Sequence, residues 1–154
     1  MADIVSPEKR SLMMSSIGPK NTRPEMMVRK GLHSQGFRYK LHVSNMPGKP
    51  DLVFPRYHAV IFVHGCFWHG HDCNLFKWPS TREEFWRIKI NRNRQKDVES
   101  RAALFSAGWR VGIIWECAIK GKARLQADEL IKKIGDWLLS GSIFQEIQGA
   151  ENDT

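Results

Sequence analysis

The sequence has little of what membrane spans and disulfide frameworks require. Its longest unbroken apolar run covers residues 59–63, far below the roughly 18 residues that a transmembrane helix needs. Only three cysteines occur in 154 residues, and an odd number cannot pair completely. The N-terminal residues carry charges where a secretion signal would have its apolar segment. We therefore expect a cytoplasmic protein with no membrane partner, whose cysteines bind a metal or pack in the core.

Acidic residues are also scarce relative to basic ones. Sixteen Asp and Glu stand against 24 Lys and Arg, which gives a formal net charge of +8 at pH 7. Such an excess favours a polyanionic partner, of which nucleic acid is the commonest, although solubility and an acidic protein partner are alternatives. The apolar fraction of 42% argues against a disordered chain, and the length suits a single hydrophobic core.

The order of predicted elements indicates one α/β domain. We find no internal repeat and no low-complexity linker, and we place the domain at 21–140, between a flexible basic arm at 1–20 and a mobile tail at 141–154. Capping-box patterns at 22–25 and 81–84 predict helices that end before Gly36 and Gly108. A third helix is predicted over 125–139, and strands over 37–42, 51–54, 59–63 and 109–115. Their order favours a central mixed sheet flanked by helices.

Histidine and cysteine are concentrated in residues 64–73. This segment holds three of the six histidines and two of the three cysteines. Cys66, His71 and Cys73 have the residue types and the close spacing that zinc requires, and Cys117 can complete a tetrahedral set if its strand lies beside 59–63. Four protein ligands would make this zinc structural. The alternative is that Cys66 and Cys117 are small buried residues and that the histidines are solvated.

Carboxylates near the same segment suggest a second site. Asp51 begins one predicted strand and His64 ends the next, so a hairpin would bring them together. A carboxylate beside an imidazole suits Mg²⁺ binding and water activation. Glu25, in the first turn of the first predicted helix, is a further candidate. Asp51 as a turn residue and Glu25 as part of a capping box are the alternatives.

Several of these motifs together resemble one enzyme family. The similarity spans about residues 10–137, and the sequence is similar to the very-short-patch repair (Vsr) DNA mismatch endonucleases. It is carried by His71 and Cys73 and by the segments 47–51 (PGKPD), 60–69 (VIFVHGCFWH), 81–86 (TREEFW), 108–111 (GWRV) and 115–118 (WECA). The resemblance implies a fold of the type II restriction endonuclease class, a structural zinc, and Mg²⁺-dependent nicking. The nick would lie 5′ of the thymine in T:G mismatches that arise when 5-methylcytosine deaminates.

The resemblance also implies roles for individual residues. Asp51 and the main-chain oxygen of Val63 would bind Mg²⁺. His69 would be the general base toward water, His64 would assist at the phosphate, and Glu25 would support the site from its helix. Where related nucleases end the active-site strand with Glu-x-Lys, this chain has residues 62–64 (FVH). It also departs from the family at Val63, where a threonine is expected, and at Gly70, where a histidine is expected.

A further set of residues is expected to contact DNA. Phe67 and Trp68 lie in the loop that zinc would hold and could insert between base steps, although packing into the core is the alternative. The resemblance adds Met14, from the N-terminal arm, as an insertion from the other groove. Lys89 and Asn93 share a helix face that could reach the mispair or remain solvated.

Two other functions fit the same residues. The first is a zinc-stapled DNA-binding module without nuclease activity, and the second is a nicking endonuclease with a different target. The family resemblance implies a monomer acting on double-stranded DNA, with possible downstream repair proteins. The flanking recognition sequence, the associated methyltransferase and the partner proteins are left open by the sequence.

Overall fold

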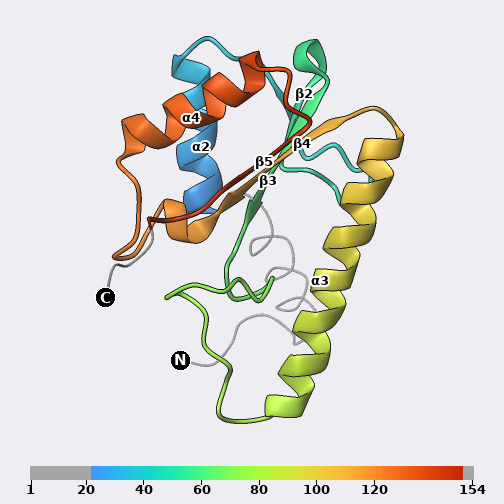
Figure 1. The fold of residues 1–154 in the computed structure, drawn as a ribbon, viewed down its shortest axis with the longest axis vertical. Coiled ribbons are helices and arrows are strands. Elements are labelled where there is room, and N and C mark those ends of the chain that lie inside the picture. The colour runs from blue at the N-terminus through green and yellow to red at the C-terminus, as the bar shows by residue number, and fades with distance from the viewer. Residues whose placement is uncertain (1–21, 151–154) are drawn as a thin grey trace, which may run out of the picture.

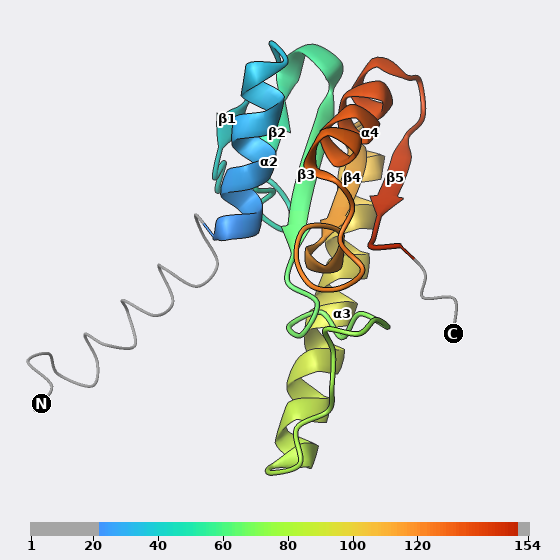
Figure 2. The ribbon, with the colours of Figure 1, turned by 90° about the vertical axis from the view of Figure 1, so that its left-hand side faces the viewer.

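A five-stranded mixed sheet organises the chain. The computed structural model describes residues 22–150, so the predicted arm at 1–20, Met14 included, lies outside the described residues. Neighbouring strands follow one another in sequence order, as the view in Figure 2 makes plain. The strands are β1 (Lys40–Leu41), β2 (Leu52–Phe54), β3 (Ala59–His64), β4 (Arg110–Trp115) and β5 (Phe144–Ile147).

Strand direction changes in the middle of the sheet. β1, β2 and β3 pair antiparallel, whereas β3, β4 and β5 pair parallel. The β2–β3 connection is a short turn that includes the 3-10 helix Pro55–Tyr57, which suits an antiparallel hairpin. The β3–β4 connection is a long crossover, as parallel strands require. The predicted mixed sheet is therefore confirmed.

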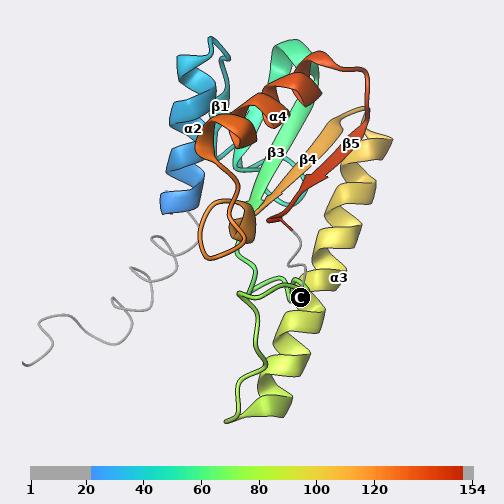
Figure 3. The ribbon, with the colours of Figure 1, turned by 60° about the vertical axis from the view of Figure 1, so that its left-hand side comes forward.

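Helices cover both faces of the sheet. α2 (Arg23–Ser34) and α4 (Ala127–Leu139) lie on one face and α3 (Glu83–Ser106) on the other, as Figures 1 and 3 show. Side chains alternate along each strand, so each face has its own buried cluster. Leu52, Ile61 and Ile114 pack with α2 and α4, while Val60 and Ile113 belong to the cluster on the α3 side.

The starts of the first two described helices differ. At α2 the predicted cap is present, because the backbone N–H of Glu25 donates to the Thr22 hydroxyl at 3.3 Å. At α3 the predicted capping box is wrong: the N-cap is Arg82, in a left-handed conformation and with no side-chain cap bond. The hydrogen-bonding side chain of Thr81 stands one residue too early to cap this helix.

No helix among residues 22–150 is long and apolar enough to cross a membrane.

The first half of α3 extends past the sheet. Only Ile90 and Leu104 of its 24 residues are buried. In Figure 1 the segment that follows β3 runs beside this half of the helix, below the edge of the sheet. The Arg94 guanidinium donates to the main-chain oxygens of His69 and Gly70 and ties the segment to the helix. The loop and this half of α3 thus form one unit.

The C-terminal segment continues the fold beyond residue 140. Strand β5 pairs with β4, with Val111 opposite Phe144 and Ile114 opposite Ile147, and Ile147 is buried. The domain boundary predicted at residue 140, with a tail after it, was therefore placed too early. A four-residue edge strand has too weak a pattern to be recognised without the partner strand that completes its hydrogen bonds.

Candidate active site and metal centre

The parallel pair β3–β4 brings the functional segments to one edge. His64 ends β3 opposite Trp115 at the end of β4, and the 3-10 helix Glu116–Ala118 follows directly. Since parallel strands end at the same edge, the residues after them become neighbours. Cys66 and Cys117, which are far apart in sequence, therefore lie close together, as the predicted four-ligand zinc site requires.

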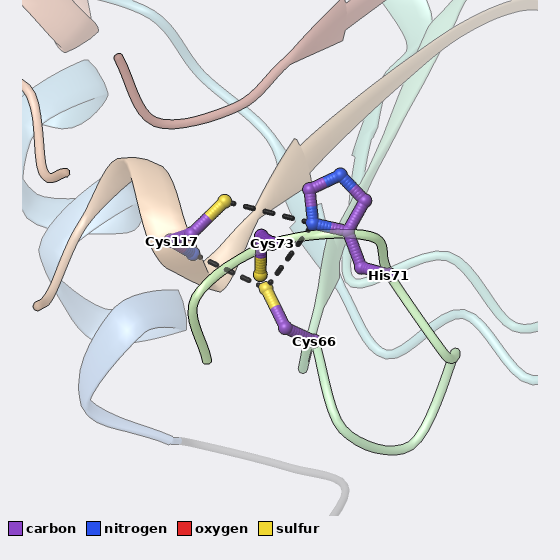
Figure 4. Close-up of side chains that lie close together, drawn as sticks. All are labelled: Cys66, His71, Cys73 and Cys117. Carbon is purple, nitrogen blue, oxygen red and sulfur yellow. Dashed lines mark hydrogen bonds between the residues drawn. The ribbon is translucent and has the colours of Figure 1, made fainter. Parts of the chain in front are cut away.

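The four residues predicted to bind zinc lie together. One potential ligand atom from each of Cys66, His71, Cys73 and Cys117 lies within 4.8 Å of the others. Figure 4 shows the three sulfur atoms and the His71 ring turned toward a common centre. Nδ1 of His71 is 3.6 Å from the sulfur of Cys66 and from that of Cys117. Three sulfurs and one imidazole nitrogen make the donor set that zinc prefers.

Backbone amides surround these sulfurs. The N–H of Cys117 donates to Sγ of Cys66 at 3.3 Å, and the N–H of Leu75 donates to Sγ of Cys73 at 3.4 Å. Burial raises the pKa of both the Cys66 and the Cys117 thiol. A metal ion deprotonates a coordinating thiol and replaces the proton that burial would otherwise retain. Amide donors then stabilise the resulting negative charge.

A second cluster joins Glu25, His42 and Asp51, whose ligand atoms also lie within 4.8 Å of one another. Glu25 is 1% exposed, and its carboxylate lies 3.3 Å from the Arg29 guanidinium and 3.4 Å from Nε2 of His42. The sequence analysis missed His42. Its backbone N–H faces the main-chain oxygen of Asp51 at 3.5 Å, so this histidine reaches the site only through the β1–β2 pairing.

The environment of Asp51 favours its protonated form. Burial raises its pKa from 3.8 to about 7, the nearby charge of Glu25 adds to the rise, and a hydrogen bond from the Val63 amide opposes it. That amide donates to Oδ2 of Asp51 at 2.6 Å. Val63 therefore lies beside Asp51 as expected, but the contact is made by its nitrogen. A metal bond from the Val63 oxygen remains a prediction.

Two histidines and an aspartate form a third cluster, of His64, His69 and Asp97. The rings of His64 and His69 are stacked, 3.8 Å apart and 5° from parallel. Nδ1 of His69 is 2.5 Å from the Asp97 carboxylate. Burial lowers the pKa of His64 well below its usual value, and the electrostatic effect of neighbouring His69 and Arg101 adds to the shift. His64 is therefore a neutral imidazole at pH 7.

Asp97 is the second residue that the sequence analysis missed. It stands on α3, 28 residues from His69, in a strongly basic stretch of the helix. A single acid among Arg92, Arg94 and Lys96 was the available signal. Only the packing of the loop on α3 shows that this acid faces a histidine.

A groove connects the second and third clusters. Glu25, Asp51, His64, His69 and Asp97 all line it. Its volume is about 1080 Å³, just above the roughly 300–1,000 Å³ typical of small-molecule pockets. Carboxylates and imidazoles thus face one space that can admit a polymer backbone. Carboxylate oxygens that suit a cation lie on one side of this space, and a histidine–aspartate pair lies on the other.

The predicted DNA-contacting aromatics lie at the rim of this groove. Trp68 is 49% exposed, whereas Phe67 packs edge-on against Trp86 at 5.3 Å. Asn93 donates from its side chain to the Trp68 main-chain oxygen at 2.9 Å, so it holds the loop in this structure. Lys89 is exposed and lines the same groove. The structure thus places these four residues together around one loop.

Comparison with known proteins places this chain among the DNA endonucleases. The family model described as "DNA mismatch endonuclease Vsr" matches residues 2–75. The chain is 41% identical over 138 residues to the DNA mismatch endonuclease Vsr of Escherichia coli, covering 90% of this chain and 88% of that protein. The chain belongs to the DNA mismatch endonuclease Vsr family, as its sequence motifs had suggested.

Other relatives carry the name of nicking enzymes. The type II nicking enzyme V.XorIIP of Xanthomonas oryzae pv. oryzae is 47% identical over 127 residues, which cover 82% of this chain and 93% of that enzyme. V.NmeAIP of Neisseria meningitidis is 42% identical over 138 residues, covering 88% of this chain and 99% of that enzyme. The similarity therefore extends over nearly the whole length of these relatives.

Proposed function

We propose that this protein is a Mg²⁺-dependent DNA endonuclease that nicks one strand 5′ of the thymine in a T:G mismatch. The observation that carries the proposal is the groove in which the Asp51 and Glu25 carboxylates and the His69–Asp97 pair face one space. The names of the relatives support both the mismatch specificity and the nicking activity, since one is a mismatch endonuclease and others are nicking enzymes. The fold class proposed with this activity is that of the type II restriction endonucleases.

Asp51 would hold the magnesium ion together with the main-chain oxygen of Val63, and Glu25 would support the site from α2. Carboxylate and carbonyl oxygens are the ligands that Mg²⁺ prefers. The ion would supply Lewis-acid stabilisation of the negative charge that develops on the phosphate and on the leaving 3′ oxygen. Arg29 and His42 bracket the Glu25 carboxylate and keep it oriented toward the groove.

His69 would act as the general base. With Nδ1 held by Asp97 at 2.5 Å, the imidazole keeps its hydrogen on that side and presents Nε2 as the proton acceptor. The negative Asp97 stabilises the imidazolium that forms when water loses its proton. His64, neutral and stacked on His69, would assist at the phosphate.

A structural zinc at Cys66, His71, Cys73 and Cys117 would fix the loop that carries both chemistry and recognition. His69, Phe67 and Trp68 all lie between Cys66 and His71, so the cluster defines where they point. Phe67 and Trp68 would insert beside the mismatch, with Met14 entering from the other groove. A mismatched step lowers the unstacking energy of a few kcal/mol that such insertion requires.

DNA recognition would also use Lys89 and Asn93. Lys89 is free to approach the mispair from the groove, while Asn93 would have to exchange its bond to Trp68 for a base contact. We propose that the enzyme acts as a monomer and passes nicked DNA to downstream repair proteins. T:G pairs produced by deamination of 5-methylcytosine would be its substrates.

Strand-specific nicking of defined duplexes tests this function. The purified protein is incubated with Mg²⁺ and one of three otherwise identical duplexes, which contain a T:G, a T:A or a C:G pair. We expect a single nick 5′ of the mismatched thymine, no nick in the matched duplexes, and none after chelation of Mg²⁺. His69→Ala serves as the inactive control.

The alternatives predict different outcomes of the same assay. Tight DNA binding without any nick would favour the zinc-stapled binding module. Equal nicking of matched and mismatched DNA would favour an endonuclease of another specificity. Repeating the assay with T:G pairs in several flanking sequences defines the recognition sequence.

A further inference from the structure

Residues 146–149 span the end of strand β5 and the two residues after it, and they contact the Cys/His cluster at two points and its neighbour Trp115 at a third. The side-chain oxygen of Gln148 lies 2.9 Å from Nε2 of His71. The backbone N–H of Gly149 donates to Sγ of Cys117 at 3.3 Å. Glu146 accepts a 2.7 Å hydrogen bond from the indole N–H of Trp115. None of these residues offers a ligand atom to the cluster itself.

The Gln148 contact favours one state of the His71 ring. An amide oxygen only accepts hydrogen bonds, so this contact is a hydrogen bond when the ring hydrogen is on Nε2. Nδ1 then keeps its lone pair and faces the sulfurs of Cys66 and Cys117 at 3.6 Å. Metal-binding histidines usually donate their second ring N–H to an acceptor in this way, which fixes the tautomer and the ring orientation.

Trp115 holds the other side of the same ring. Its indole stacks on His71, with centroids 4.0 Å apart and planes 9° from parallel, and Glu146 fixes the indole in turn. His71 is therefore oriented along its edge by Gln148 and across its face by Trp115. Both contacts involve the end of β5, because Glu146 lies in this strand and Gln148 directly follows it.

Gly149 permits the close approach of this segment. A Cβ atom at this position would lie 2.5 Å from the main-chain oxygen of Cys117 and 2.7 Å from that of Ala123. Both contacts are with backbone, which cannot move aside as a flexible side chain can. The next residue continues the docking, since the N–H of Ala150 donates to the Ala123 oxygen at 2.7 Å.

We propose that residues 146–149 form the outer shell of the metal centre, with Gln148 as the positioning residue for His71. Metal binding and docking of this segment are then mutually dependent. The inference rests on the zinc centre proposed above. Zinc affinity should fall when the segment is perturbed, and amide exchange in the segment should slow when zinc binds.

Zinc affinity is measured on the full chain by competition with a chromophoric chelator. We expect Gln148→Ala to weaken zinc binding by about three- to tenfold, less than the roughly 10- to 100-fold typical of outer-shell residues, because Gln148 is exposed. Gln148→Glu, which keeps an acceptor, should stay within about threefold of the unchanged protein. Gln95→Ala, at an exposed position on α3, is the matched control and should not change the affinity.

A second variant and a second measurement complete the test. Gly149→Ala should weaken zinc binding at least as much as Gln148→Ala, because the added methyl group displaces the segment. Hydrogen exchange should show slower exchange at 148–150 with zinc than without it, by about fivefold or more. Equal affinity in Gln148→Ala, Gly149→Ala and the control, with unchanged exchange, would overturn the outer-shell role alone. No zinc binding by the unchanged protein would overturn the metal centre as well.

Discussion

The Cys/His cluster and the carboxylate groove lie at the same edge of the sheet but differ in donor chemistry and in closure. The first offers three sulfurs and one nitrogen, with Cys66 and Cys117 buried and amides donating to each sulfur. The second offers carboxylate oxygens and imidazoles along an open groove. A closed set of soft ligands suits a structural ion, whereas an open set of hard ligands leaves room for substrate.

The comparison indicates that the two sites have different tasks. The Cys/His cluster positions the loop, and the groove holds the residues proposed for catalysis. The cluster holds the ends of the loop at residues 66 and 71, and the loop between them places His69 against Asp97. Disrupting the closed site should therefore disable both sites, whereas changes in the groove should leave the closed site intact. The following predictions test this asymmetry in order of decreasing effect.

Cys117→Ser should have the largest effect. Loss of a sulfur ligand removes zinc, releases the loop and abolishes nicking, and we expect a drop in melting temperature of about 10 °C or more. Zinc content by atomic absorption and melting by circular dichroism check this. A variant that keeps full nicking without zinc would contradict the dependence of the groove on the cluster.

His69→Ala should disable the groove alone. Removing the proposed general base is expected to slow nicking by about 10²- to 10⁴-fold, while zinc content and melting temperature remain close to those of the unchanged protein. Single-turnover nicking of a T:G duplex measures the rate. Undiminished cleavage would mean that His69 is not the base.

Asp97→Asn should have a smaller effect of the same kind. The amide cannot stabilise an imidazolium as a carboxylate does, and we expect nicking to fall by about 10- to 100-fold. Asp97→Ala should be at least as slow, and Glu99→Gln, at an exposed α3 position, is the control. If Asp97→Asn nicks as fast as the control, the histidine acts without its carboxylate partner.

Asp51→Asn should change the pH dependence of stability in the metal-free protein. The folded-state pKa of Asp51 is about 7, against 3.8 ordinarily, so the folded state binds the extra proton between these values. Stability therefore falls as pH rises from about 4 to about 7 and stays low above that. Asparagine avoids this penalty, and we expect the variant to be more stable by about 1–3 kcal/mol at pH 8 but not at pH 4.

Urea unfolding in chelator at both pH values measures this difference. Mg²⁺ should recover the lost stability at pH 8 in the unchanged protein and have no such effect on the variant. A stability difference that is the same at pH 4 and pH 8 would show that Asp51 does not carry the raised pKa.

Much of the architecture was predictable because local patterns agree with it. The Thr22 cap, the apolar run at 59–63 and the amphipathic pattern at 125–139 each specified an element that the structure confirms. The Cys/His cluster was predictable for a similar reason: three of its members fall within eight residues, and only one strand pairing was needed to add Cys117.

The residues and the strand that were missed share one physical cause. His42, Asp97 and β5 gain their roles only from partners distant in sequence: Asp51 across the β1–β2 pair, His69 across the packed loop, and β4 across a parallel edge. A lone histidine, a lone acid and a four-residue strand have no local signal that distinguishes them from solvated residues.

The sequence by itself determined most element types, the family and the four donors of the Cys/His cluster, because these depend on residue identity and short-range spacing. Tertiary structure alone decided which donors meet. It placed Asp97 on His69, raised the pKa of Asp51 by burial beside Glu25, and docked residues 146–149 on the Cys/His cluster. The physical reason is that hydrogen-bond partners, burial and charge proximity are properties of the folded chain, and no single segment contains them.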